Sequence, residues 1–130
     1  MPGKRILVVE DEDLVREVWV DALRESGYAV EGFQFGGEAL GRLPELTPHL
    51  ILLDMMMPKM DGFEFLARLR RNPGWAHVPV LIVSALGDDL RHSIDPASAK
   101  TLGVVGVLTK PVNLETLLAE VSRVIGRAAT

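Results

Sequence analysis

The sequence contains no cysteine, so it can form neither disulfide bonds nor thiolate metal sites. Basic residues are outnumbered, with 14 lysines and arginines against 18 acidic residues and a net charge of -4. Duplex binding depends on basic side chains that neutralise phosphates, and the sequence shows no basic patch. We therefore expect no direct contact with nucleic acid.

Long apolar runs are missing as well. No run approaches the roughly 20 apolar residues of a membrane span. Lys4 and Arg5 precede only four apolar residues, whereas a secretory signal needs about 7–15. We expect no membrane segment, and the lack of cysteine fits a reducing compartment, so the expected location is the cytoplasm.

The apolar share of 48% in 130 residues is ample for one packed core and leaves no room for a second folded unit. We therefore expect a single domain over residues 1–130, with its core from about 5 to 126. Whether an effector domain follows Thr130 is left open.

Short apolar runs alternate with amphipathic stretches along the chain. The runs are too short for helices and rich in β-branched residues, which predicts buried strands at 6–9, 28–33, 50–53, 78–83 and 104–108. Between them, apolar residues at helical spacing predict a helix that the acids at 11–13 cap and begin, a short helix over 37–43 ended by Pro44, and helices from 61 and from 113. This alternation indicates an α/β fold with a parallel sheet and helices on both of its faces.

One segment has a weaker pattern. Asp95 stands before Pro96, and proline is favoured in the first turn of a helix, so Asp95 is expected to cap a short, late-starting fourth helix. The residues before it, 87–94, are expected to form an extended loop.

Polar residues follow four of the predicted strands at the point where each ends. They are Glu10 with Asp11, then Asp54, Ser84 and Lys110. In a parallel sheet the carboxyl ends of the strands meet at one edge, where the binding crevice lies. Four different polar ends at one edge predict a shared site.

These positions form an ordered set that resembles the receiver domain of two-component response regulators. The set comprises Val9-Glu10-Asp11, Asp54-Met-Met-Met-Pro58 with Asp61-Gly62, Ser84-Ala85, Gly103 and Lys110-Pro111. The resemblance covers about residues 5–126. It implies a flavodoxin-like, doubly wound (βα)5 fold with a five-stranded parallel sheet in the order 2-1-3-4-5.

The resemblance also implies a function. Asp54 would accept a phosphoryl group from a sensor histidine kinase or a phosphotransfer protein, and phosphorylation would switch contacts with a downstream protein or a fused effector domain. A homodimer is compatible with this role. The transition state of phosphoryl transfer spreads charge over equatorial oxygens, which Lys110 would stabilise with its ammonium and Ser84 with its hydroxyl.

Crowded carboxylates repel one another and an incoming phosphate, so a cation must intervene. Mg²⁺ prefers hard oxygen ligands in octahedral geometry. The resemblance assigns it to Glu10, Asp11, Asp54 and the backbone carbonyl of Met56.

Other positions of the pattern have structural roles or depart from the family. Pro58 and Gly62 belong to the segment after the acceptor, and Pro111 is expected to follow a cis bond that aims Lys110. Receivers usually carry Phe or Tyr three residues before the lysine, where this chain has Val107. We therefore expect the signal to leave through the 85–94 segment and the short helix after Asp95, and not through an aromatic rotamer.

Each residue also has a simpler interpretation. Glu10 and Asp11 could be only the acidic start of a helix, Ser84 a strand-end hydroxyl, and Lys110 a surface lysine. For the whole chain, one alternative is a pseudo-receiver that binds partners without phosphorylation. Another is a haloacid-dehalogenase-type phosphatase, but Met56 occupies the place where that family needs a second aspartate. We expect a signalling domain and no enzyme.

Overall fold

The computed structural model describes residues 3–127. Its strands are β1 (Arg5–Val9), β2 (Ala29–Phe33), β3 (Leu50–Leu53), β4 (Val80–Ser84) and β5 (Val104–Thr109). Its helices are α1 (Asp13–Glu25), α2 (Gly36–Leu46), α3 (Gly62–Arg71), α4 (Gly87–Ser93), α5 (Pro96–Leu102) and α6 (Leu114–Ile125). The strands form one parallel sheet in the order β2-β1-β3-β4-β5, which confirms the doubly wound α/β prediction.

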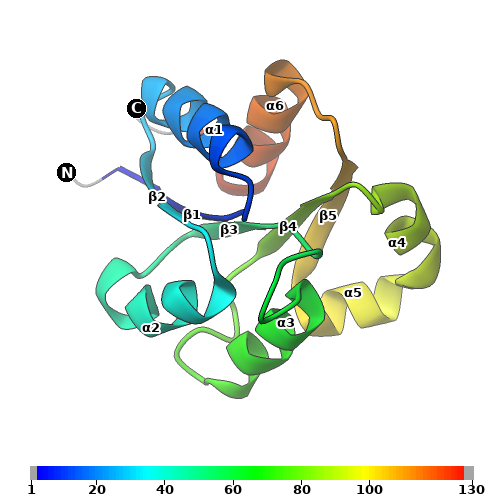
Figure 1. Cartoon of the computed structure of the whole chain (residues 1–130). Coiled ribbons are helices and arrows are strands. Elements are labelled where there is room, and N and C mark those ends of the chain that lie inside the picture. The colour runs from blue at the N-terminus through cyan, green and yellow to red at the C-terminus, as the bar shows by residue number, and fades with distance from the viewer. Residues whose placement is uncertain (1–2, 128–130) are drawn as a thin grey trace.

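The sheet lies between two helical layers (Figure 1), with α1 and α6 on one face and α2 and α3 on the other. Alternate residues of the central strands supply the two cores. Ile6 and Leu52 pack with Leu117 of α6 on one face, whereas Leu7 and Leu53 pack on the other, with the helices there. Strands buried on both faces explain why their sequence is continuously apolar.

The expected extended loop over 87–94 is wrong, because residues 87–93 form α4. Leu90 is buried and anchors the helix, while Asp88 lies in its first turn, where a negative charge is favourable. The late-starting helix after Asp95 is confirmed as α5: the Asp95 carboxylate accepts a 2.7 Å hydrogen bond from the Ser98 backbone N–H. The chain therefore has two short helices where one was expected.

The expected end of the second helix at Pro44 is also wrong, since α2 continues to Leu46. Proline removes one helical hydrogen bond, but only the last turn follows it. Leu43 and Leu46 are buried on either side of Pro44 and hold that turn against the core.

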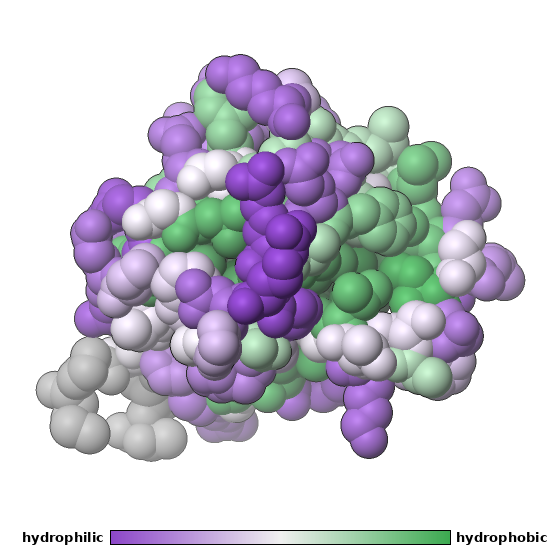
Figure 2. Space-filling model, turned by 90° about the horizontal axis from the view of Figure 1, so that it is seen from below, coloured by the Kyte–Doolittle hydropathy of each residue, from purple (hydrophilic) through white to green (hydrophobic). Residues whose placement is uncertain are grey.

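The surface carries both polar and apolar areas. Seen from below, hydrophilic side chains form a band across the middle of one face, with apolar surface beside it (Figure 2). Large apolar side chains are exposed on α1 at Leu14 and Val18, on α3 at Phe63, and near the strand ends at Met56 and Leu86. Within residues 3–127, every helix is too short or too polar to cross a membrane.

Candidate functional site

Three carboxylates meet where β1 and β3 end. β1 and β3 are paired neighbours, and the Asp54 backbone N–H continues their ladder by donating to Val9 O at 3.1 Å. Glu10, Asp11 and Asp54 each place one carboxylate oxygen within 4.8 Å of the others. The structure thus brings together the three acidic residues that the sequence predicted as neighbours.

Lys110 enters the same cluster from the end of β5. Its backbone N–H donates to Ser84 O at 3.0 Å, and its ammonium lies 2.6 Å from Glu10 Oε1 and 3.3 Å from Asp54 Oδ2. The bond to Pro111 is cis, as predicted. One cation therefore serves several carboxylates.

Ser84 ends β4, the strand between β3 and β5. Its side chain is fully buried, and its hydroxyl oxygen accepts a 3.3 Å hydrogen bond from the Leu86 backbone N–H. The serine is thus placed between the strands that carry Asp54 and Lys110, and its hydroxyl also holds the chain that enters α4.

Burial dominates the electrostatics of the cluster. It raises the pKa of Glu10 to about 7, against the opposing effects of Lys110 and the Glu12 N–H. Burial also raises the pKa of Asp54, which the Met56 N–H and Lys110 oppose. Burial alone would lower the pKa of Lys110, but contacts with Glu10 and Asp54 outweigh it, so that pKa is raised. The deprotonated forms of Glu10 and Asp54 are therefore energetically unfavourable in this cluster unless more positive charge is present.

One atom of the cluster suits a metal ion. Glu10 Oε1 is buried and has no hydrogen-bond partner; the Lys110 ammonium is close to it but not in hydrogen-bond geometry. A buried carboxylate oxygen without a hydrogen bond is unfavourable, and coordination of a hard cation would satisfy it. The three-carboxylate set therefore fits Mg²⁺ on its own chemistry.

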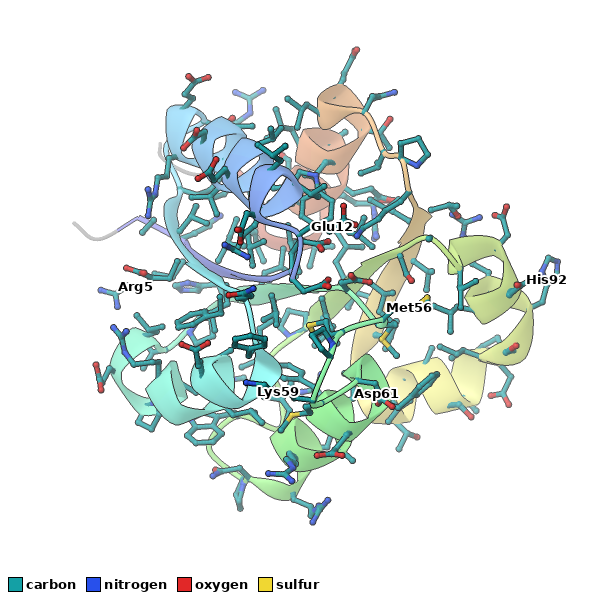
Figure 3. All side chains as sticks on the ribbon, viewed as in Figure 1. Arg5, Glu12, Met56, Lys59, Asp61 and His92 are labelled. Atoms are coloured by element: carbon teal, nitrogen blue, oxygen red, sulfur yellow. The ribbon has the colours of Figure 1, made fainter. Side chains whose placement is uncertain are left out.

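The segment after Asp54 folds back tightly. The Met56 N–H donates to Asp54 Oδ1 at 3.1 Å, and the Gly62 N–H donates to Met55 O at 3.0 Å. A Cβ at Gly62 would lie 2.7 Å from the Met55 Cα, which explains the glycine. Pro58 O accepts a 2.8 Å hydrogen bond from the Met60 N–H inside the same loop. Figure 3 shows Met56 and Glu12 on opposite sides of the strand ends.

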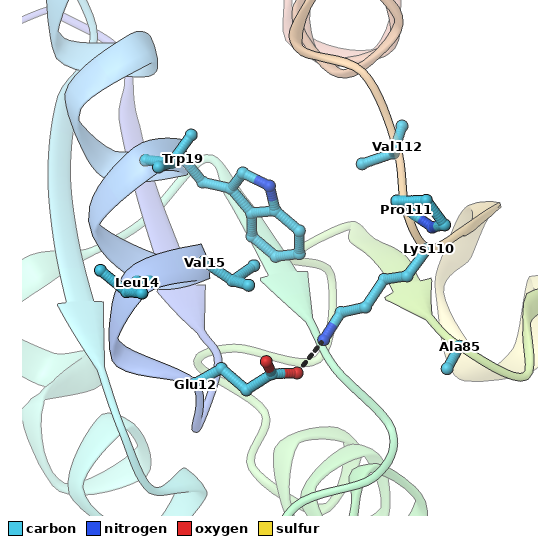
Figure 4. Close-up of a pocket in the computed structure, with 9 residues that line it drawn as sticks. Glu12, Leu14, Val15, Trp19, Ala85, Lys110, Pro111 and Val112 are labelled. Carbon is cyan, nitrogen blue, oxygen red and sulfur yellow. Dashed lines mark ion pairs between the residues drawn. The ribbon is translucent and has the colours of Figure 1, made fainter.

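The sequence did not reveal two neighbours of Lys110. Glu12 was expected to help cap α1, but its side chain makes no capping bond, and its carboxylate lies 3.6 Å from the Lys110 ammonium instead (Figure 4). The Trp19 ring is buried and has its centroid 5.7 Å from the same nitrogen. The run of acids at 11–13 drew attention to Glu12, but the direction of the Glu12 side chain depends on the fold.

Val107 of β5 contacts α4 through its backbone. Its side chain is half-buried against the core, and its carbonyl accepts a 2.8 Å hydrogen bond from Arg91 Nε of α4. The structure thus places an arginine contact beside the position where the family pattern has an aromatic ring.

Known proteins are similar to this chain in sequence and in fold. The chain is 35% identical to the DNA-binding dual master transcriptional regulator RpaA of Synechocystis, over 95% of this chain and 49% of the relative. It is 39% identical to a protein-glutamate methylesterase/protein-glutamine glutaminase of Trichodesmium erythraeum, over 88% of this chain and 32% of the relative. The chain thus spans about a third to a half of these two relatives.

A solved structure of similar length is the chemotaxis protein CheY4 of Vibrio cholerae, with a TM-score of 0.82 and 31% identity over 93% of this chain and 98% of that one. Residues 6–122 match the family described as the response regulator receiver domain. The chain therefore belongs to the receiver domains of two-component response regulators.

Proposed function

We propose that Asp54 is the phosphoacceptor of this receiver domain, in a Mg²⁺-dependent reaction in the cytoplasm. The donor is a phosphohistidine of a sensor histidine kinase or phosphotransfer protein. The observation that carries the proposal is the placement of one buried carboxylate, Asp54, 3.3 Å from an ammonium and inside a three-carboxylate set that fits a divalent cation.

In this reaction a carboxylate oxygen of Asp54 attacks phosphorus, an O–P bond forms, and the P–N bond to the donor histidine breaks. The histidine leaves and takes up a proton. Glu10, Asp11, Asp54 and the Met56 carbonyl would hold Mg²⁺, which neutralises charge on the phosphoryl oxygens. Lys110 exchanges its contact with Glu10 for one with the phosphoryl group, and the Ser84 hydroxyl donates to another phosphoryl oxygen.

A groove beside Lys110 offers the donor a docking surface. It has a volume of about 550 Å³ and is lined mainly by apolar side chains of α1 and of the segment after β5 (Figure 4), including Leu14, Val15, Val18, Trp19, Pro111 and Val112. Leu14 is 77% exposed. Lys110 lines the groove and its ammonium lies 3.3 Å from Asp54, so an apolar helix of the donor that docks here would bury this surface beside the acceptor.

The direct test is incubation with acetyl phosphate and Mg²⁺, followed by intact mass measurement. We expect one added phosphoryl group, and none in Asp54→Asn. An acyl phosphate that persists in Asp54→Asn would refute the assignment, and an unmodified wild-type protein would favour a pseudo-receiver.

The proposed roles of Asp11 as a metal ligand and of Lys110 as the group that contacts the phosphoryl group can be tested by calorimetric titration with Mg²⁺. Asp11→Ala removes an anionic ligand, so Mg²⁺ binding and phosphorylation should weaken together. Lys110→Ala keeps the carboxylates, so Mg²⁺ should still bind while the conformational response to phosphorylation is blunted. Loss of Mg²⁺ binding in Lys110→Ala would contradict these roles.

The proposed switch acts through protein contacts. The relatives carry this domain in about a third to a half of their length, so the output belongs to a downstream protein, a fused effector domain or a second copy of the chain. Pulldown of candidate partners with and without beryllofluoride, a phosphoryl mimic, would show whether binding follows occupancy of Asp54.

A further inference from the structure

α4 follows the Ser84 end of β4 and packs against the edge strand β5. At its start, the Leu86 N–H donates to Ser84 Oγ at 3.3 Å. Gly87 packs so closely on β5 that a Cβ there would lie 2.8 Å from the Thr109 Cα and 2.9 Å from Leu108 O. The first turn of α4 is thus held by the site serine on one side and by the β5 backbone on the other.

Three side chains then fasten α4 to β5, and we call Asp88, Arg91 and Thr109 the clamp. Arg91 pairs with Asp88 Oδ1 at 2.7 Å and donates to Thr109 Oγ1 at 3.2 Å, and the Thr109 hydroxyl donates to Asp88 Oδ1 at 3.2 Å. Arg91 also donates to Val107 O at 2.8 Å. These bonds close a ring between the helix and the strand.

The clamp joins the two chain segments that carry the groups expected to read a phosphoryl group. Thr109 directly precedes Lys110, and Asp88 lies one residue beyond Gly87, close to Ser84. Arg91 reaches the backbone of residue 107, where an aromatic ring would otherwise report on the serine.

We propose that the Asp88–Arg91–Thr109 clamp couples the position of α4 on β5 to phosphorylation of Asp54. This inference rests on the proposed function, because it requires a phosphoryl group at Asp54. It assigns the output to a polar contact between α4 and β5. In this chain no aromatic rotamer is present to play that part.

Phosphorylation reaches the clamp from two residues of the site. When the Ser84 hydroxyl turns to a phosphoryl oxygen, its hydrogen bond with the Leu86 N–H changes, and when Lys110 leaves Glu10, the neighbouring Thr109 shifts. Because the clamp bonds α4 to Thr109, the two displacements occur together. α4 then packs against β5, and its hydrogen bonds open less often. If the clamp carries this coupling, breaking it uncouples α4 from the occupancy of the site, and the effect holds in both directions because coupling is reciprocal.

Hydrogen exchange of the full chain, with Mg²⁺ and with or without beryllofluoride, tests this directly. The variants are Thr109→Val, which keeps the shape but removes the hydroxyl, and Arg91→Ala. A matched control is Arg123→Ala: Arg123 donates to Val105 O of the same strand and pairs with Glu120 three residues before it, as Arg91 does with Val107 O and Asp88.

In wild type and Arg123→Ala, beryllofluoride should slow exchange over residues 86–93. In Thr109→Val and Arg91→Ala, which each lose more than one of these exposed hydrogen bonds, these amides should exchange roughly two- to tenfold faster without the mimic. Their response to beryllofluoride should be lost, while fluorine NMR still shows it bound.

The clamp is overturned by an unchanged α4 response in both clamp variants, or by wild-type protein that binds beryllofluoride without a change at 86–93. Equal loss of the response in Arg123→Ala would overturn it too, since any arginine that donates to the β5 backbone would then have the same effect. Failure of wild type to bind beryllofluoride would refute the proposed function itself, and the clamp with it.

Discussion

Two parts of the molecule flank the acidic cluster and are held in different ways. α3 follows the Asp54 loop, is ten residues long, and buries Phe65, Leu66 and Leu69 completely. α4 and α5 follow Ser84, have seven residues each, and bury between them only Gly87 and Leu90. Apolar burial fixes the side that carries Asp54, the proposed acceptor, whereas polar contacts hold the side that the proposed switch would move.

The two parts should differ most in how much stability they lose when a buried side chain is shortened to alanine. Phe65→Ala removes a fully buried ring from the α3 side, and should lower the free energy of unfolding by about 3–5 kcal/mol. Leu90→Ala in α4 should cost about 2 kcal/mol, at the low end for a buried leucine, because a short surface helix can relax into the gap. Urea unfolding measures both. A larger loss in Leu90→Ala would break the comparison.

Arg70 bridges the two parts. Its guanidinium donates from α3 to Leu102 O at 2.5 Å, Val78 O at 2.7 Å and Ala76 O at 2.9 Å, and burial lowers the pKa of Arg70. Lysine has one nitrogen and cannot reach all these carbonyls, so Arg70→Lys should cost about 2–3 kcal/mol. Thermal unfolding would test this, with the exposed Arg71→Lys as the control.

Hydrogen exchange should localise that loss to α5 and the segment before β4. Mg²⁺ binding at Asp54 should stay unchanged in Arg70→Lys, because the arginine contacts none of the cluster. Weakened Mg²⁺ binding in this variant would show that the two parts are more tightly coupled than their contacts indicate.

The same contrast explains what the sequence could predict. Glu10, Asp54 and Lys110 each follow a strand and Ser84 ends one, and parallel strands bring such ends together by geometry alone. The two cores and the order of the sheet follow from continuous apolar runs and from the family pattern. α4 has one large buried side chain, Leu90, in seven residues, which is too little for a helical period.

Long-range polar contacts leave no local pattern either. Arg91 and Thr109 are 18 residues apart, and nothing near either residue predicts their hydrogen bond. Glu12 was visible as an acid at the start of a helix, but its direction toward Lys110 depends on where β5 ends. Such contacts follow from the assembled sheet and not from the segments that form it.

The acidic cluster should make the stability of the metal-free protein depend on pH. Burial raises the pKa of Glu10 from 4.5 to about 7, so the folded state holds this proton more tightly than the unfolded state. The stabilisation is complete below about pH 4.5 and is lost as pH rises through 7, and Asp54 acts with the same sign. Between pH 5 and 8 the loss from Glu10 should be about 2 kcal/mol.

Urea unfolding at pH 5 and pH 8 in the presence of EDTA measures this loss. Glu10→Gln should flatten the dependence, and saturating Mg²⁺ should stabilise wild type more at pH 8 than at pH 5, because the ion competes with protons for the carboxylates. Equal pH dependence in Glu10→Gln would show that another group is responsible.

The smallest expected changes in stability are those of alanine substitutions at two glycines. They compare how closely α4 and α2 are packed against their neighbours. A Cβ at Gly87 would press on the β5 backbone, 2.8 Å from the Thr109 Cα, whereas a Cβ at Gly41 of α2 meets nothing within 4 Å. Gly87→Ala should therefore lower stability by about 1 kcal/mol, since α4 must shift outward. Gly41→Ala should raise it by about 0.5–1 kcal/mol, because alanine favours a helix interior. Thermal unfolding gives both signs, and stabilisation by Gly87→Ala would mean that α4 is not pressed against β5.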